Sequence, residues 1–207
     1  MGTNSESIRI KIGNISEENK SFIWLLPKTG TNHAVGIFRR FGFYSYGQYV
    51  DGITKKELNA NHWTHHFEGH EKYSFICTAR NPFTRILSLY KFNVKDSSHW
   101  NPENFKTYFW ENFKPNLLKN FIINFDERKP DYVIRIESLY QDYIKIPFIN
   151  DSEFNKSGEL LKYCNIKVNS TQEIQNISEY YTDDMINLVL EYGKNHFETL
   201  GYNNFLN

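Results

Sequence analysis

The fold of this chain is decided by residues 21–41, which read SFIWLLPKTGTNHAVGIFRRF. Residues 21–26 are a short apolar run that ends at Pro27 and Gly30, and such a run predicts a buried strand entering a tight loop. Residues 32–41 then continue as a predicted helix. The stretch therefore combines a strand, a glycine-containing loop and a helix.

The same succession recurs further along the chain. Residues 73–79 predict a second buried strand, stopped by Pro82 and followed by apolar residues at helical spacing. A third strand is predicted at residues 131–136, a final helix at residues 182–197, and a loop at residues 150–158. Alternation of this kind predicts an α/β fold, a central mostly parallel sheet flanked by helices, with ligands at the carboxyl ends of the strands.

Length and composition limit the function classes. The 207 residues fit a single domain over residues 1–207, with residues 1–20 as a peripheral N-terminal segment. Lysine plus arginine equals aspartate plus glutamate at 24 each, so we expect neither nucleic acid nor a membrane as partner, and any anion must be bound locally. With two cysteines and no apolar signal or spanning run, we predict a cytoplasmic protein; the oligomeric state is left open.

The loop at residues 27–32 has the layout of an anion site. A turn that leads into a helix gathers backbone N–H groups around one point, and the helix dipole favours negative charge there. Lys28 adds a cation, the hydroxyls of Thr29 and Thr31 add donors, and Gly30 permits close approach of the backbone. An ordinary strand-to-helix turn with a solvated lysine is the alternative for such a motif alone. A Walker A loop is disfavoured because the lysine here precedes the single glycine.

This loop, Pro27-Lys28-Thr29-Gly30-Thr31 after a strand, resembles the 5′-phosphosulfate loop of sulfotransferases. Asn32 departs from the family pattern, which usually has Ser or Thr there. Their donor is 3′-phosphoadenosine 5′-phosphosulfate (PAPS). The resemblance implies that residues 28–32 bind the phosphosulfate end of the donor, that PAPS is the co-substrate, and that no metal is needed.

A second motif strengthens the resemblance. Residues 75–90, FICTARNPFTRILSLY, are similar to the family's strand, Arg-x-Pro and following helix. Arg80 offers a planar fork to a phosphate, and Ser88, eight positions later, offers a hydroxyl. The resemblance implies that Arg80 and Ser88 bind the 3′-phosphate.

Further similarity favours the carbohydrate-type branch of the family. Residues 135–139 resemble a family strand end, and residues 180–202 resemble the C-terminal helix of that branch. The Arg-Lys-Gly stretch of cytosolic small-molecule sulfotransferases is absent. The resemblance implies a P-loop-kinase-like sulfotransferase fold, and a saccharide or related small molecule that accepts sulfate on a hydroxyl.

Sulfuryl transfer needs a cation on the leaving phosphate and a base on the acceptor. Lys28 is the candidate cation. Residues 61–70 hold four of the seven histidines. His62-Trp63-Thr64 resembles the His-x-Ser/Thr context of carbohydrate-type family members, and this resemblance implies His62 as the candidate base, with His65 and His66 as alternatives. Two other interpretations of this cluster stay open. The histidines could be loop or capping residues without a catalytic role, or they could be ligands of a zinc site.

Two other functions stay open from the sequence. A nucleotide or small-molecule kinase shares this kind of sheet but requires magnesium and a Walker-type loop. A non-catalytic nucleotide-binding protein would bind the donor without turning it over. Transfer of labelled sulfate separates both from a sulfotransferase.

Overall fold

The computed structural model describes residues 9–49, 52–58, 69–113, 128–166 and 176–202. The chain divides into two compact units, unit 1 with residues 1–79 and 130–168, and unit 2 with residues 80–129 and 169–207. Each unit is described by itself. The single domain over residues 1–207 stays a prediction.

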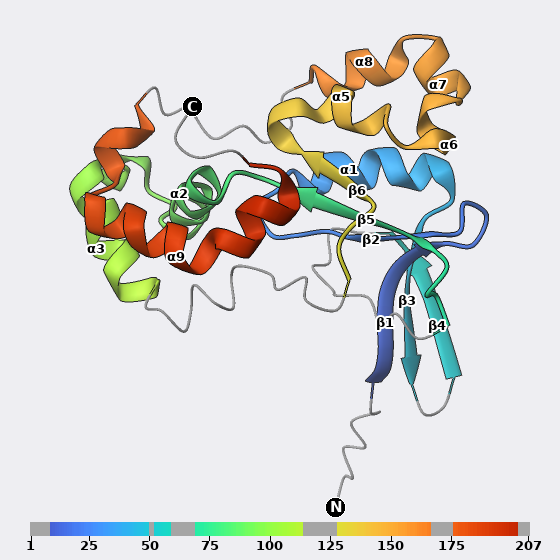
Figure 1. Cartoon of the computed structure of the whole chain (residues 1–207), viewed down its shortest axis with the longest axis horizontal. Helices are drawn as coiled ribbons and strands as arrows, with labels where there is room; N and C mark the ends of the chain where they lie inside the picture. Colours follow the sequence, from blue (N-terminus) through green and yellow to red (C-terminus); the bar gives the residue numbers. More distant parts are fainter. Residues whose placement is uncertain (1–8, 50–51, 59–68, 114–127, 167–175, 203–207) are drawn as a thin grey trace, which may run out of the picture. The chain divides into compact units, whose positions relative to one another are not determined.

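Unit 1 contains a six-stranded mixed sheet, so the chain is an α/β protein (Figure 1). The strands follow the order β4-β3-β1-β2-β5-β6 across the sheet. Their bounds are β1 Arg9–Ser16, β2 Ser21–Trp24, β3 Tyr44–Tyr49, β4 Gly52–Glu57, β5 Ser74–Ala79 and β6 Tyr132–Arg135. The three strands expected from the apolar runs are present as β2, β5 and β6.

The prediction of a mostly parallel sheet is wrong. Only the β2–β5 and β5–β6 pairs are parallel among the described strands, whereas β1 pairs antiparallel with β2 and β3, and β3 with β4. Antiparallel neighbours need only a short connection, and β1 and β2 are joined by residues 17–20. Residues 9–16 thus lie within the sheet, between β3 and β2, which differs from a peripheral N-terminal segment.

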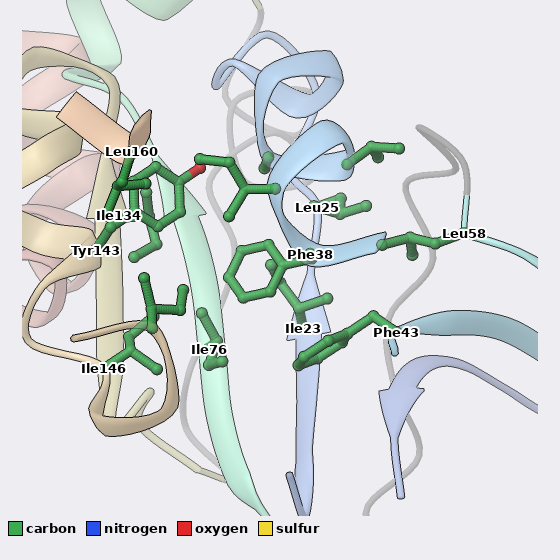
Figure 2. Packing of buried hydrophobic residues seen from close by; sticks show 14 residues of the cluster. Ile23, Leu25, Phe38, Phe43, Leu58, Ile76, Ile134, Tyr143, Ile146 and Leu160 are labelled. Atoms are coloured by element: carbon green, nitrogen blue, oxygen red, sulfur yellow. The ribbon is translucent and has the colours of Figure 1, made fainter. Parts of the chain in front are cut away.

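The helices of unit 1 pack on the sheet through one apolar core. They are α1 Thr31–Phe38, α5 Leu139–Tyr143, α6 Pro147–Asn150, α7 Glu153–Lys156 and α8 Glu159–Cys164, with 3-10 turns at Arg39–Phe41 and Ile136–Ser138. Figure 2 shows Ile23 of β2, Ile76 of β5 and Ile134 of β6 meeting Phe38 and Tyr143 from the helices. All five are at most 1% exposed, and burying side chains of this size stabilises the fold by about 1.5–3 kcal/mol each.

Residues 150–158 were predicted to be a loop, and this prediction is wrong in part. α7 forms there because the side chain of Ser152 caps it, accepting a hydrogen bond from the Asn155 backbone N–H at 3.2 Å. Gly158 ends the segment with a φ of 78°, a left-handed conformation that suits glycine.

Unit 2 is helical in its described part. It contains α2 Pro82–Asn93, α3 Pro102–Asn112 and α9 Asp183–Leu200, with 3-10 turns at Ser97–His99 and Ile177–Tyr180. Its core is rich in aromatic rings, and Phe105 and Phe83 both pack edge-on against Tyr181. The Tyr181 hydroxyl also donates to the Phe83 carbonyl at 2.7 Å, which ties the first turn of α2 to the chain before α9.

The two ends of α9 lie at residues whose types favour helix ends. Thr182 caps the N-terminus by accepting from the Met185 N–H at 3.5 Å, and Asp183 and Asp184 complement the helix dipole in the first turn. Gly201, with a φ of 70°, closes the helix in the left-handed conformation. The predicted helix at residues 182–197 is therefore confirmed. In the parts of the chain that the structure describes, no helix has the length and apolar character needed to cross a bilayer.

Candidate functional site

The loop at residues 27–32 lies where β2 leaves the sheet. β2 runs parallel to β5, in register from Ser21 opposite Ser74 to Trp24 opposite Cys77. The loop therefore leaves the same sheet edge as the residues that follow Ala79, the end of β5. In open α/β sheets, ligands bind at this carboxyl edge.

The backbone of this loop alternates in handedness. Lys28 has a φ of 63° and Gly30 a φ of 75°, whereas Thr29 between them keeps a negative φ. Such alternation is the backbone arrangement of a nest, in which successive N–H groups point into one anion-binding concavity. For a lysine the left-handed conformation costs on the order of 1–3 kcal/mol, a strain that is concentrated at functional sites.

The threonine hydroxyls brace the loop from within. Both Thr29 Oγ1 and Thr31 Oγ1 donate to the Leu26 carbonyl, at 2.8 and 2.9 Å. Thr29 Oγ1 also lies 2.6 Å from Thr78 Oγ1 on β5, and Thr78 accepts the Leu26 N–H at 3.0 Å. All these groups are buried. The hydroxyls of Thr29 and Thr31 thus fix the shape of the loop, and their predicted contact with an anion stays a prediction.

Thr78 is a site residue that sequence reasoning missed. Its hydroxyl is buried in β5 next to the apolar run Phe75-Ile76-Cys77, and a buried hydroxyl needs a hydrogen-bonding partner. The position of a hydroxyl residue in a predicted buried strand could therefore have indicated that Thr78 has a polar partner. The identity of the partner depends on the parallel register of β2 and β5, which the sequence does not state.

Gly30 joins the loop to α1. It is the N-cap residue of α1, and a Cβ added to it would lie 3.3 Å from Ile136 Cδ1. The first turn of α1 contains no acidic residue, and within this fully described helix no side chain caps the N-terminus. Asn32, in that first turn, is exposed. The helix thus presents its positive end at the loop without a built-in negative charge.

His33 anchors α1 to the helices behind it. Its Nδ1 lies 3.4 Å from the Tyr143 hydroxyl and its Nε2 lies 3.3 Å from the Tyr163 carbonyl. Burial lowers the pKa of His33, although the hydrogen bond to the Tyr163 backbone acts in the opposite direction. A Cβ on Gly36 would lie 2.0 Å from the Tyr163 hydroxyl, so a glycine is needed for this close packing.

Arg135, the last residue of β6, forms an ion pair within unit 1. Its guanidinium donates to the buried carboxylate of Asp142 at 2.6 and 2.9 Å. Burial acts to raise the pKa of Asp142, but hydrogen bonds from Arg135, Lys145 and Ser138 outweigh it and lower that pKa to about 2. This network ties the end of β6 to α5.

The second predicted motif lies at the start of unit 2. Asn81 caps α2 by accepting from the Phe83 N–H at 3.0 Å, and Pro82 occupies the first helical position. Arg80 Nε donates to Thr84 Oγ1 at 3.0 Å, so the guanidinium is held along the helix. Ser88 lies one further turn along α2 and is 6% exposed. Thr84 and Ser88 are four residues apart on one face of α2, and Arg80, which precedes the helix, reaches that face through its hydrogen bond to Thr84.

The predicted base falls outside the described part of the chain. His62, and the alternatives His65 and His66, belong to residues 59–68. Their role stays a prediction. Among the described residues, no group of three or more His, Cys, Asp and Glu side chains could hold a metal ion. Cys77 and Cys164 do not form a disulfide.

Comparison with known proteins leaves the family open. No family model matches the chain. Searches of curated proteins and of solved structures likewise give no significant match. The function is therefore argued from the residues and geometry given above.

Proposed function

We propose that this chain is a PAPS-dependent sulfotransferase that transfers a sulfuryl group to a hydroxyl of a saccharide or related small acceptor. In this proposal the α/β fold is of the P-loop-kinase-like sulfotransferase type. The observation that supports it is the loop at residues 27–32, in which a lysine with a φ of 63° lies in a turn between a parallel strand and a helix N-terminus. The Arg80 and Ser88 face of α2 supports a nucleotide that carries a second phosphate.

The reaction is an in-line displacement at sulfur. The acceptor oxygen forms a bond to sulfur as the bond from sulfur to the bridging phosphate oxygen breaks, and the acceptor proton passes to a base. The leaving group is adenosine 3′,5′-bisphosphate, which gains negative charge in the transition state. The ammonium of Lys28 and the loop N–H groups stabilise that charge.

The other parts of the site have separate tasks. Arg80 and Ser88 bind the 3′-phosphate, Arg80 as a charged donor and Ser88 through its hydroxyl. The base is a histidine of residues 62–66, with His62 as the first candidate. The acceptor binds without a metal ion.

Incubation of the purified chain with ³⁵S-labelled PAPS and a panel of hydroxylated saccharides tests the proposal. Transfer of label to at least one acceptor, with release of adenosine 3′,5′-bisphosphate, is the expected result. Binding of the bisphosphate without transfer to any acceptor would point instead to a non-catalytic nucleotide-binding protein. Phosphate transfer from ATP and magnesium, with no bisphosphate binding, would replace the proposal with a kinase.

Paired variants at Lys28 separate chemistry from folding. Lys28→Ala and Lys28→Gly both remove the ammonium, and each should lower turnover by about 10²- to 10³-fold. Because Lys28 has a φ of 63°, glycine relieves strain that alanine retains, and the glycine variant should be more stable by about 1 kcal/mol. Turnover by labelled-sulfate transfer and urea unfolding provide the two measurements. Turnover that follows stability across the pair would mean that Lys28 acts through folding.

A further inference from the structure

One face of α2 carries a line of cationic and hydroxyl side chains longer than the predicted motif. Thr84, Ser88 and Lys91 are four and three residues apart, a spacing that places them on the same face of a helix. Arg80 joins this line through its hydrogen bond to Thr84. The line thus begins and ends with a cation.

Lys91 is not a solvated surface lysine. The residue is 6% exposed, and its Nζ lies 4.8 Å from the centroid of the Trp100 ring. Trp100 is itself held in place, because its Nε1 donates to the Val94 carbonyl at 2.6 Å and its carbonyl accepts from the Tyr180 hydroxyl at 3.3 Å. An ammonium over a fixed indole face has a defined position.

The two cations act on each other. Burial lowers the pKa of Lys91, and the positive charge of Arg80 lowers it further. Two like charges that are partly removed from water repel each other, and an anion bound beside them attracts both and offsets that repulsion. The Thr84 hydroxyl accepts from Arg80 and donates to the Asn81 carbonyl at 3.0 Å, so it positions Arg80. The Ser88 hydroxyl lies on the same helix face between the two cations, and hydroxyls donate readily to phosphate oxygens.

We propose that Lys91 is a specificity-determining residue, the second cation of a phosphate-monoester subsite formed with Arg80 and Ser88. This inference rests on the proposed function, in which Arg80 and Ser88 bind the 3′-phosphate of the nucleotide. A dianionic phosphate gains from both cations, whereas a free 3′-hydroxyl gains from neither. Lys91 therefore selects 3′-phosphorylated nucleotides over nucleotides phosphorylated only at the 5′ position.

Calorimetric titration of the full chain with adenosine 3′,5′-bisphosphate and with adenosine 5′-monophosphate tests this role. Lys91→Met keeps the length of the side chain and its packing on Trp100 but removes the charge. It should weaken bisphosphate binding about tenfold or more and leave monophosphate binding unchanged. The matched control is Lys95→Met, which removes the same charge from an exposed position of the same unit and should change neither affinity.

The possible failures are distinguishable. If the unmodified chain binds the bisphosphate no more tightly than the monophosphate, the proposed function fails and the subsite fails with it. If the unmodified chain prefers the bisphosphate and Lys91→Met keeps that preference, the inference fails and the proposed function stands. Equal weakening of both nucleotides in Lys91→Met would also overturn the inference, because the loss would not be specific to the 3′-phosphate.

A measurement on the unmodified chain covers the case in which Lys91→Met does not fold. The pKa of Lys91 can be followed by NMR of ¹³C-labelled lysine side chains. Addition of the bisphosphate should raise this pKa, because an adjacent dianion favours the charged ammonium. The monophosphate should leave it unchanged. An unchanged Lys91 pKa at saturating bisphosphate would overturn the inference.

Discussion

At the scale of single residues, the candidate site depends on two backbone conformations. Lys28 and Gly30 both have positive φ values, of 63° and 75°, on either side of Thr29. Glycine adopts this conformation without strain, whereas lysine does not. The buried hydroxyls of Thr29 and Thr31, bonded to the Leu26 carbonyl, hold the loop in this shape. The loop is therefore formed before any ligand arrives, which lowers the cost of binding an anion.

Gly30→Ala should destabilise unit 1 more than Gly158→Ala does. Both glycines have nearly the same φ, 75° and 78°, so both variants incur a similar backbone strain, about 1 kcal/mol. Only at Gly30 does the added Cβ meet a neighbour, Ile136 Cδ1 at 3.3 Å, whereas nothing lies within 4 Å at Gly158. Urea unfolding of the two variants measures the difference. Equal destabilisation would show that Ile136 moves aside at no cost.

Residue types at the site were predictable from the sequence, but their partners were not. The Lys28-to-Thr31 pattern predicts an anion-binding loop, Arg80 and Ser88 predict a phosphate-binding face, and both stay predictions. The bracing role of Thr78 depends on strand register, and the contact of Lys91 with Trp100 depends on how the chain turns after α2. Interactions between residues distant in sequence are set by packing, which local patterns do not encode.

At the scale of elements, the strands and helix starts that the sequence predicted best are those marked by continuous apolar runs and by capping residues. β2 and β5 are continuous buried runs, and α2 and α9 begin at Asn81 and Thr182, which cap them as their residue types suggest. The antiparallel half of the sheet was not predicted. Its strands β1, β3 and β4 contain glycine and many polar residues, so their alternation is weak, although Arg9-Ile10-Lys11-Ile12 in β1 does alternate.

α9 also carries a buried titratable group, His196, which should make unit 2 sensitive to acid. Burial, and then the charge of Arg85, lower the pKa of His196 to about 3. An unfolded histidine has a pKa of about 6.5, so below that pH the unfolded chain binds a proton that the folded chain excludes. The free energy of unfolding therefore falls as pH decreases from about 6.5 towards 3. This loss is about 2 kcal/mol between pH 7.5 and pH 5.

His196→Gln should remove most of the decrease in the free energy of unfolding between pH 7.5 and pH 5, whatever its effect on stability at pH 7.5. Urea unfolding followed by circular dichroism at both pH values measures it. His99→Gln is the matched control, because the side chain of His99 in the same unit is 64% exposed, and it should keep the pH dependence of the unmodified chain. If His196→Gln loses as much stability between the two pH values as the unmodified chain, another group causes the sensitivity.

At the scale of the whole molecule, the boundary between the compact units lies inside a motif. Unit 1 ends its first segment at Ala79 and unit 2 begins at Arg80, within the run FICTARNPF. Domain boundaries are predicted from glycine-, proline- or serine-rich linkers, and no such linker separates β5 from Arg80. Both units are also discontinuous in sequence, which no compositional signal indicates.

The two predicted anion-binding elements belong to different units, the loop at residues 27–32 to unit 1 and the Arg80-to-Lys91 face to unit 2. With 24 basic and 24 acidic residues the chain has no net charge to attract an anion from a distance, so affinity must come from these local contacts. In the proposed function, the loop binds one phosphate group of the nucleotide and the Arg80-to-Lys91 face binds the other.

Hydrogen exchange measured by mass spectrometry should therefore distinguish nucleotides by the peptides they protect. Adenosine 3′,5′-bisphosphate should slow exchange both in a peptide covering residues 27–32 and in one covering residues 80–91. Adenosine 5′-monophosphate, which lacks the 3′-phosphate, should protect the first peptide alone. Arg80→Ala should abolish the protection of the second peptide by the bisphosphate and leave that of the first. Protection of only one peptide by the bisphosphate in the unmodified chain would mean that the two elements do not serve the same nucleotide.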